Sequence, residues 1–439
     1  MSPLRGRLLG APRAASLVSV LPVAALAALV AGAVVARVAV PRSPAADSTA
    51  ASVECTEPAA AGLVAPAPGS ARAPGLTGPT PPPAARVPEG SPRVQHGDAA
   101  RTHRSAAVGP RSARLVFAAA VGGAVAAQVT CSPDEQTLYV ATLAGALVAL
   151  DRAGRERFRV DLGERSYTAP AVAGDGTVYV GSDAGKLFAV SPAGQVSFRV
   201  ELGGEVDVAP LLLPSGEVFV VAGRTLAWID RRGNVVRRLQ AKRKVFTAPA
   251  LAGDLVVFGA QDDHAYGVRV STGAVVFRTP LGADVDGSPA VADDGSVYFG
   301  TDAGEIAHLA PNGGVLGRVK VGGYVRGPLS IARNGDVVVG TYGPAPRLVR
   351  VRGDAVAGAF ALQGTGSREF GVHGGALEDA SGTLYFGAQD DEVYGVSPEG
   401  ARVLAFRTGG DVDAPLTLLR DGTLVVPSED GRVYALAAQ

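Results

Sequence analysis

The first quarter of the sequence lacks aromatic residues. All ten tyrosines, the thirteen phenylalanines and the single tryptophan lie at or after Phe117. Aromatic side chains supply much of the buried area of a packed core, so a segment without them has little to anchor one. The 439 residues are enough for one large repeat domain or two ordinary domains. We therefore expect the folded part to begin near residue 111.

The chain also lacks an excess of charge. It carries 41 basic and 41 acidic residues, which gives a formal net charge of zero. The expected folded part has no long basic run interleaved with aromatic residues. Nucleic-acid binding depends on such a positive surface, so we expect no nucleic acid among the partners.

Cysteine is scarce, with only Cys55 and Cys131 in the whole sequence. Outside the cytoplasm these two residues could form a disulfide. We instead expect Cys131 to be a small buried side chain that is unrelated to Cys55, and keep the disulfide as the alternative. Two cysteines so far apart, with no histidine nearby, do not form a metal-ligand pattern.

The N-terminus has the pattern of an export signal. Arg5, Arg7 and Arg13 precede an uncharged apolar stretch at 14–36, which ends at Arg37. A stretch of this length is close to the roughly 20 residues that span a bilayer and longer than the about 7–15 of a cleaved signal peptide. We therefore expect residues 1–40 to be an uncleaved signal anchor. Arginines before the span keep the N-terminus in the cytoplasm and place the remainder outside it.

Cleavage after Ala36 is the alternative for this segment. Val34 and Ala36 form a small-residue pattern that a signal peptidase accepts, and the protein would then be secreted. In either case the folded part is expected to be extracytoplasmic or periplasmic, in the cell envelope. No cysteine stands at the end of the apolar stretch, so we expect no lipid-modified N-terminus.

Residues 41–110 are rich in proline. They hold 13 of the 31 prolines in a background of Ala, Gly, Ser and Thr. This composition is typical of a disordered tether, which would hold the folded domain above the membrane surface.

From residue 126 onward the sequence repeats with a period near forty residues. Each unit reads as four short apolar strands separated by Gly-rich turns, and no stretch of ten residues has the 3.6-residue apolar spacing of a helix without a Gly or Pro interruption. Four strands at this period predict one propeller blade per unit. The clearest units begin at Ala169, Ala209, Ala248, Ser288, Pro328, Gly375 and Ala414.

The ends of the sequence predict a closed ring. The last unit supplies three strands, and residues 114–127 align with the fourth strand of a unit at 195–208, with Phe117 opposite Phe198. Pairing of the first strand with the last blade would remove the exposed sheet edges of an open array. We expect an all-β fold: an eight-bladed β-propeller of four-stranded antiparallel blades at 111–439, closed by the N-terminal strand and preceded by one transmembrane or signal helix.

The end of each unit resembles the pyrroloquinoline-quinone-like β-propeller repeat of the quinoprotein alcohol dehydrogenase-like superfamily. The family pattern is an apolar strand, a Thr-Gly or similar turn and an aromatic-basic pair, as in "GVRVSTGAVVFRTPLG" at 267–282. The resemblance covers 111–439, and eight blades is the usual number in the superfamily. The pair recurs as Phe158–Arg159, Phe198–Arg199, Phe277–Arg278 and Phe406–Arg407.

The features of the catalytic members are missing. Their recurring tryptophans are reduced here to Trp228, and adjacent cysteines and a recognisable Glu/Asn/Asp calcium cage are absent. The chain is more similar to the non-catalytic branch that includes the outer-membrane assembly scaffold propeller. This resemblance implies no enzyme activity, no catalytic residues, and no pyrroloquinoline quinone, calcium or other metal. It implies a protein-interaction or scaffolding module whose partner is a protein or another envelope component. The alternative is a quinone- or metal-dependent oxidoreductase with an unrecognised site.

Equivalent repeat positions predict a ring of side chains. Nine residues before the glycine of the Asp-Gly-type turn, the chain crosses from one blade to the next near the axial channel. The first of these equivalent positions is Ala126. A funnel with acidic, basic and aromatic groups could bind an extended polypeptide, a small polar ligand or a cation, and the alternative is ordinary solvated loops. The candidate binding residues are Tyr167, Asp207, Phe246, Asp286, Arg326, His373 and Asp413.

Two further features concern the same face. Two residues before the ring positions stand Arg165, Glu205, Lys244, Asp284, Tyr324 and Asp411. The sixth unit departs from the period through "YGPAPR" at 342–347 and an insertion at 363–374. Insertions in repeat arrays often emerge as loops on the binding face, although sequence drift explains them equally well.

Overall fold

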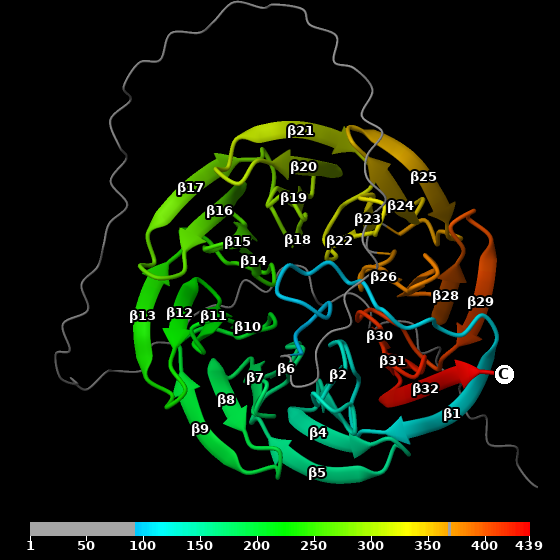
Figure 1. The fold of residues 1–439 in the computed structure, drawn as a ribbon, viewed down its shortest axis with the longest axis horizontal. Helices are drawn as coiled ribbons and strands as arrows, with labels where there is room; N and C mark the ends of the chain where they lie inside the picture. The colour runs from blue at the N-terminus through cyan, green and yellow to red at the C-terminus, as the bar shows by residue number, and fades with distance from the viewer. Residues whose placement is uncertain (1–92, 368–369) are drawn as a thin grey trace, which may run out of the picture. The chain divides into compact units, whose positions relative to one another are not determined.

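The computed structural model describes residues 93–367 and 370–439. These residues form eight four-stranded antiparallel sheets, which are arranged as blades around a central axis (Figure 1). In each blade the first strand lies next to the axis and the fourth strand lies at the circumference. The predicted eight-bladed propeller is therefore confirmed.

The first four blades follow the chain in order from the inner to the outer strand. Their strands are β2 (Thr130–Cys131), β3 (Thr137–Ala141), β4 (Ala146–Asp151) and β5 (Glu156–Asp161); β6 (Ala171–Val172), β7 (Val178–Ser182), β8 (Lys186–Val190) and β9 (Val196–Glu201); β10 (Leu211–Leu212), β11 (Val218–Ala222), β12 (Thr225–Ile229) and β13 (Val235–Gln240); and β14 (Ala250–Ala252), β15 (Leu255–Ala260), β16 (His264–Arg269) and β17 (Val275–Pro280).

The next three blades repeat this order, and the eighth takes its outer strand from the start of the domain. Their strands are β18 (Gly287–Val291), β19 (Val297–Gly300), β20 (Glu305–Leu309) and β21 (Val315–Lys320); β22 (Ser330–Ile331), β23 (Val337–Gly340), β24 (Arg347–Arg352) and β25 (Ala355–Ala361); β26 (Leu377–Glu378), β27 (Leu384–Gly387), β28 (Glu392–Val396) and β29 (Arg402–Arg407); and β30 (Thr417–Leu418), β31 (Leu424–Ser428), β32 (Arg432–Ala438) and β1 (Ala113–Ala120).

The middle strands of each blade form the core. In β7 every residue is buried, because the blade has a neighbouring blade on both of its faces. Such strands read as continuous apolar runs instead of alternating ones. The outer strand β9 has solvent on one side and correspondingly alternates between exposed and buried residues near its end. The sequence pattern of each unit thus follows from the position of its strands in the ring.

The ring is closed by pairing between β1 and β32. The strands are antiparallel, and the register places Leu115 opposite Leu436 and Ala118 opposite Tyr434. Phe117 packs against the buried cluster of the first blade. The predicted closing strand is confirmed, and the two sheet edges of an open array are paired with each other.

Phenylalanines of the outer strands dock neighbouring blades. The aromatic ring of Phe158 lies against Gly194, which stands in the turn before the outer strand of the following blade. A Cβ atom at Gly194 would lie 2.5 Å from the ring of Phe158. The same contact joins Phe117 to Gly154, Phe198 to Gly233 and Phe277 to Gly313. Three of the four Phe-Arg phenylalanines, and Phe117 at the equivalent position, therefore form one kind of inter-blade contact with a turn glycine.

The structure corrects the expected start of the folded part. Residues 93–110, which the sequence assigns to the tether, cross the centre of the ring before reaching β1 (Figure 1). This N-terminal segment is bound through its main chain, which needs no aromatic side chains, and composition therefore gave no sign of it. Its carbonyl groups accept hydrogen bonds from the N–H groups of Val172, Leu251, Val291, Ile331 and Glu378, at 2.7–3.1 Å.

Three residues of the N-terminal segment adopt left-handed backbone conformations. They are His96, Arg101 and His103, with φ of 61°, 62° and 58°. All three side chains are buried, and the two imidazole rings stack with their centroids 4.1 Å apart. Arg101 donates to the carbonyl oxygens of Pro249, at 2.9 Å, and Gln95, at 3.0 Å. Such conformations persist only where the surrounding structure fixes them, so this segment is an integral part of the domain.

No helix among the described residues is long and apolar enough to cross a membrane. The predicted anchor at 1–40 and the tether up to residue 92 lie outside the described residues, as does Cys55. Cys131 is a buried free thiol, and burial raises its pKa to about 12.

The inter-blade contact can be tested at Gly194. Gly194→Ala places a methyl group against Phe158 at a backbone φ of +83°, so we expect a loss of about 2–4 kcal/mol in the free energy of unfolding. Gly163→Ala is the matched control, because its φ is +82° and a Cβ there meets nothing within 4 Å. It should cost only about 1 kcal/mol. Equal losses in chemical denaturation of the two variants would contradict the docking role.

Candidate functional site

The predicted ring positions are structurally equivalent. The residue before each one donates its backbone N–H to a carbonyl at the end of the second strand of the preceding blade, at 3.0–3.4 Å. Repetition of this bond fixes every crossing at the same height, so the ring residues surround one end of the channel. We call this end the mouth. The donors are Val125, Ser166, Val206, Val245, Val285, Val325, Val372 and Val412.

The mouth contains a second set of side chains that sequence reasoning missed. These residues directly follow the second strand of a blade, and their N–H groups donate to the carbonyl two residues before a ring position. The spacing of the repeat contained this signal, because the set recurs with the same period as the ring. Its members are Leu143, Asp183, Gly223, Gln261, Asp302, Tyr342, Gln389 and Glu429.

The second set contacts the ring positions directly. Asp302 pairs with Arg326, at 3.0 Å between Nη2 and Oδ2. Gln389 donates to the carboxylate of Asp413 at 3.0 Å. Gln261 donates to Asp286 at 3.3 Å, and Tyr342 meets the ring of His373 edge-on with centroids 5.7 Å apart. Four of the seven candidate ring residues are therefore held by partners from the adjoining blade.

Basic and aromatic groups pair within the mouth. The guanidinium of Arg165 lies 5.8 Å from the ring centroid of Tyr167, and the ammonium of Lys244 lies 5.6 Å from that of Phe246. These distances permit cation–π attraction. Tyr167 is 39% exposed and thus presents an aromatic surface to solvent. In these two blades, therefore, the side chain at the ring position stacks with the basic side chain two residues before it.

The acidic groups of the mouth are partly desolvated. Burial raises the pKa of Asp286 and of Asp413 to about 6. Burial and the neighbouring Asp183 raise the pKa of Asp207 to about 7. Burial, followed by the charge of Asp413, raises the pKa of Asp411 to about 7. Crowded carboxylates of this kind favour a proton or a cationic group from a partner.

The insertion of the sixth unit reaches the same face. Gly343 donates its N–H to the carbonyl of Phe370 at 3.0 Å, and Gly371 donates to Gln389, a member of the second set, at 3.0 Å. Phe370 is buried, whereas His373 is exposed. A cavity of about 710 Å³ lies beside the insertion and is lined by Gln363, Phe370, Asp391 and Arg407 among others. The insertion thus adds to the surface around the mouth, and Arg368 and Glu369 lie outside the described residues.

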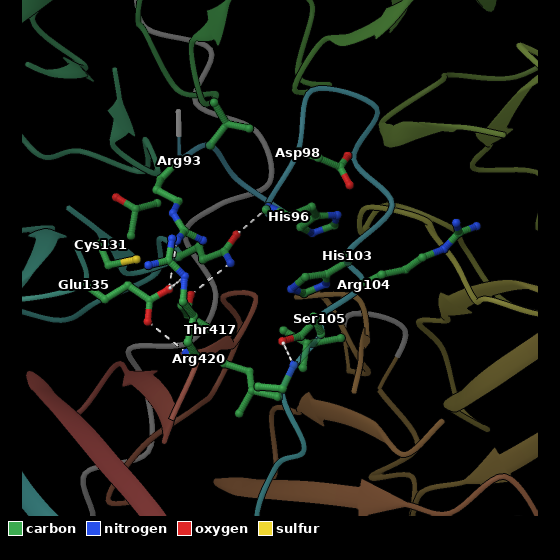
Figure 2. A pocket seen from close by; sticks show the side chains of 18 residues that line it. Arg93, His96, Asp98, His103, Arg104, Ser105, Cys131, Glu135, Thr417 and Arg420 are labelled. Carbon is green, nitrogen blue, oxygen red and sulfur yellow. Dashed lines mark hydrogen bonds and ion pairs between the residues drawn. The ribbon is translucent and has the colours of Figure 1, made fainter. Parts of the chain in front are cut away.

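The N-terminal segment lies at the opposite end of the channel. It pairs with inner strands five residues after the ring positions, which is roughly 16 Å along an extended chain. Between this segment and the first and eighth blades is a cavity of about 550 Å³ (Figure 2). Its wall includes Arg93, His103, Cys131 and Arg420. We call it the free-edge cavity, because β2 and β30 border it.

Within 93–367 and 370–439, no group of three or more His, Cys, Asp or Glu side chains is placed to hold a metal ion. The acidic residues of the mouth are spread around the ring instead of converging on one point. Binding by the ring residues stays a prediction.

The fold and its repeats define the chain as a propeller of the pyrroloquinoline-quinone-like repeat class. A family model described as outer membrane protein assembly factor BamB matches residues 103–193 and 170–334, which together make up more than half of the chain. The chain belongs to this family. The predicted resemblance is thereby confirmed, and the match begins within the N-terminal segment.

Solved structures show the same fold. BamB from Moraxella catarrhalis superposes with a TM-score of 0.62 at 17% identity, over 74% of this chain and 99% of that chain. A quinohemoprotein alcohol dehydrogenase from Comamonas testosteroni gives a TM-score of 0.66 at 13% identity, over 78% of this chain and 80% of that one. No curated protein matches the sequence. At these identities the solved structures support the fold and do not decide between scaffold and enzyme.

The desolvation of the mouth can be tested by titration. Because the pKa of Asp413 is raised in the folded state, its contribution to the free energy of unfolding should fall as the pH rises from about 4 to about 6, and stay low above that. Asp413→Asn should therefore raise the free energy of unfolding at pH 7.5 by roughly 1 kcal/mol and leave it unchanged near pH 3.5. Asp293→Asn serves as the control, since that side chain is 85% exposed. Urea unfolding at both pH values measures the difference, and an equal effect of the two variants would refute this account.

Proposed function

We propose that the chain is a non-enzymatic, exported propeller that acts as a protein-interaction or scaffolding module in the bacterial cell envelope. The observation that carries this proposal is the match of more than half of the chain to the assembly-factor family. That family's description supports a partner that is a protein or another component of the envelope.

The mouth is the surface we propose for partner binding. It combines crowded carboxylates with two basic-aromatic pairs, Arg165 with the exposed Tyr167 and Lys244 with the half-buried Phe246. Aromatic and arginine side chains are the types that most often dominate binding energy at protein interfaces. Asp207, Asp286, Asp413 and their neighbours would select basic groups of the partner.

A photo-crosslinking experiment tests this assignment. A photoreactive amino acid at position 167, in the mouth, should give a discrete protein adduct in cells that produce the full chain. The same amino acid at position 316 is the control, because Leu316 is 60% exposed on the outer strand β21, far from the axis. The absence of an adduct at position 167, or the same adducts at both positions, would count against the mouth.

The alternative, a quinone- or metal-dependent oxidoreductase, predicts a different result. A cofactor that binds only the folded state raises its stability in proportion to the logarithm of its concentration. We propose that the chain binds neither pyrroloquinoline quinone nor calcium, and expect the Tm of the purified full chain to be unchanged when both are added. A concentration-dependent rise in Tm would favour the oxidoreductase instead.

A further inference from the structure

One backbone N–H group recurs at an equivalent place on every innermost strand, five residues after each ring position. In β6 this group belongs to Val172, whose neighbour Ala173 donates back to the second strand at Thr177. Successive residues of a strand point their N–H groups to opposite sides. The N–H of Val172 consequently points away from the blade and into the channel, where the carbonyl of Arg93 accepts it at 2.7 Å.

Five of the eight equivalent groups are bound by the N-terminal segment. The pairs are Val172 with Arg93, Leu251 with Ala99, Val291 with Ala100, Ile331 with Thr102 and Glu378 with His103. The channel therefore already binds a polypeptide segment through its main chain. This mode of recognition depends little on the sequence of the bound segment.

The three remaining groups belong to Cys131, Leu212 and Leu418. In each case the following residue donates back to its own blade, as Ser132 does to Thr137, so the geometry matches that of Val172. Among the described residues, no main-chain acceptor outside their own blade bonds these three N–H groups. Cys131 and Leu418 both line the free-edge cavity, whereas Leu212 does not.

The free-edge cavity has further unused hydrogen-bonding groups. Arg93 Nε and Thr130 Oγ1 are buried and have no partner within the part of the chain that the structure describes. Thr130 is only 3% exposed. Buried polar atoms normally have partners, so these two unpaired atoms point to a polar ligand.

The charge of the cavity favours an acidic ligand. Three arginines, at positions 93, 104 and 420, line it, against two carboxylates, Asp98 and Glu135. Arg104 also pairs, at 3.4 Å, with Asp293 outside the cavity. Glu135 pairs with Arg93 at 2.9 Å and with Arg420 at 3.4 Å, and Asp98 accepts from the hydroxyl of Thr102 at 2.5 Å. Figure 2 shows Arg93, Glu135 and Arg420 on the wall opposite His96 and His103. Positive charge therefore exceeds negative charge around the open space.

We propose that the free-edge cavity binds an extended, acidic peptide segment from a partner protein. Its carbonyl oxygens accept from the N–H groups of Cys131 and Leu418, and its carboxylate lies against Arg93 and Arg420. The N-terminal segment pairs with the inner strands of five blades. The bound peptide makes the same kind of pairing with the inner strands of the first and eighth blades. This proposal rests on the proposed function only in that the partner is a polypeptide. The binding site lies at the end of the channel opposite the mouth.

The test begins with selection of random decapeptides displayed on phage against the immobilised full chain. Leu418→Pro removes one of the two channel-facing N–H groups, and proline is tolerated where a strand N–H is unpaired. Leu212→Pro is the matched control, because it makes the same change at the equivalent position outside the cavity. Synthetic copies of the selected peptides should contain Asp or Glu. Their Kd in titration calorimetry should rise about tenfold in Leu418→Pro and stay within about twofold in Leu212→Pro.

A second variant tests the charge and remains informative if Leu418→Pro does not fold. In Arg420→Gln the selected peptides should lose most of their preference for Glu over Gln at the acidic position, while thermal unfolding confirms that the domain is intact. Failure to select any peptide, equal binding by Leu418→Pro, or an unchanged Glu preference in Arg420→Gln would overturn the proposal. None of these outcomes affects the crosslink at position 167, so the two proposals fail separately.

Discussion

Closure of the ring is the constraint on which the rest of the structure depends. The pairing of β1 with β32 joins the ends of the domain, so that every blade has a neighbour on both faces. Only under that condition are strands such as β7 buried along their whole length. At four junctions a turn glycine contacts a phenylalanine of the preceding blade, as Gly194 contacts Phe158, and this contact lets the blades approach closely. Both the mouth and the opposite end of the channel are consequences of this closed geometry.

The two ends of the channel differ in what occupies them. At the mouth, the crossing loops display side chains whose polar groups are shared between adjoining blades, as in the pair Arg326 and Asp302. At the other end, the innermost strands present backbone N–H groups, and the chain's own N-terminal segment binds five of them. One repeat thus produces two chemically different surfaces, one formed by side chains and one by main-chain groups.

Membership of the assembly-factor family and similarity to a dehydrogenase are compatible, because the propeller supports both kinds of function. The two functions differ in their sites and not in the fold. The acidic and aromatic groups of the mouth and the unpaired N–H groups of Cys131 and Leu418 are both suited to polypeptide partners. The two surfaces therefore both agree with the proposed interaction role, one through side chains and the other through main-chain groups.

The repeat, the number of blades, the closing strand and the ring positions were all predictable from the sequence, because each strand's burial is written into a local pattern of about forty residues. Phe117 aligned with Phe198 was enough to identify the closing strand. The partners of the ring, such as Gln389 beside Asp413, were visible only when adjoining blades were placed together. The burial of Arg101 and the pairing of residues 93–110 could not be predicted, since main-chain hydrogen bonds to distant strands leave no compositional signature. Tertiary structure alone decided which inner-strand N–H groups remain free.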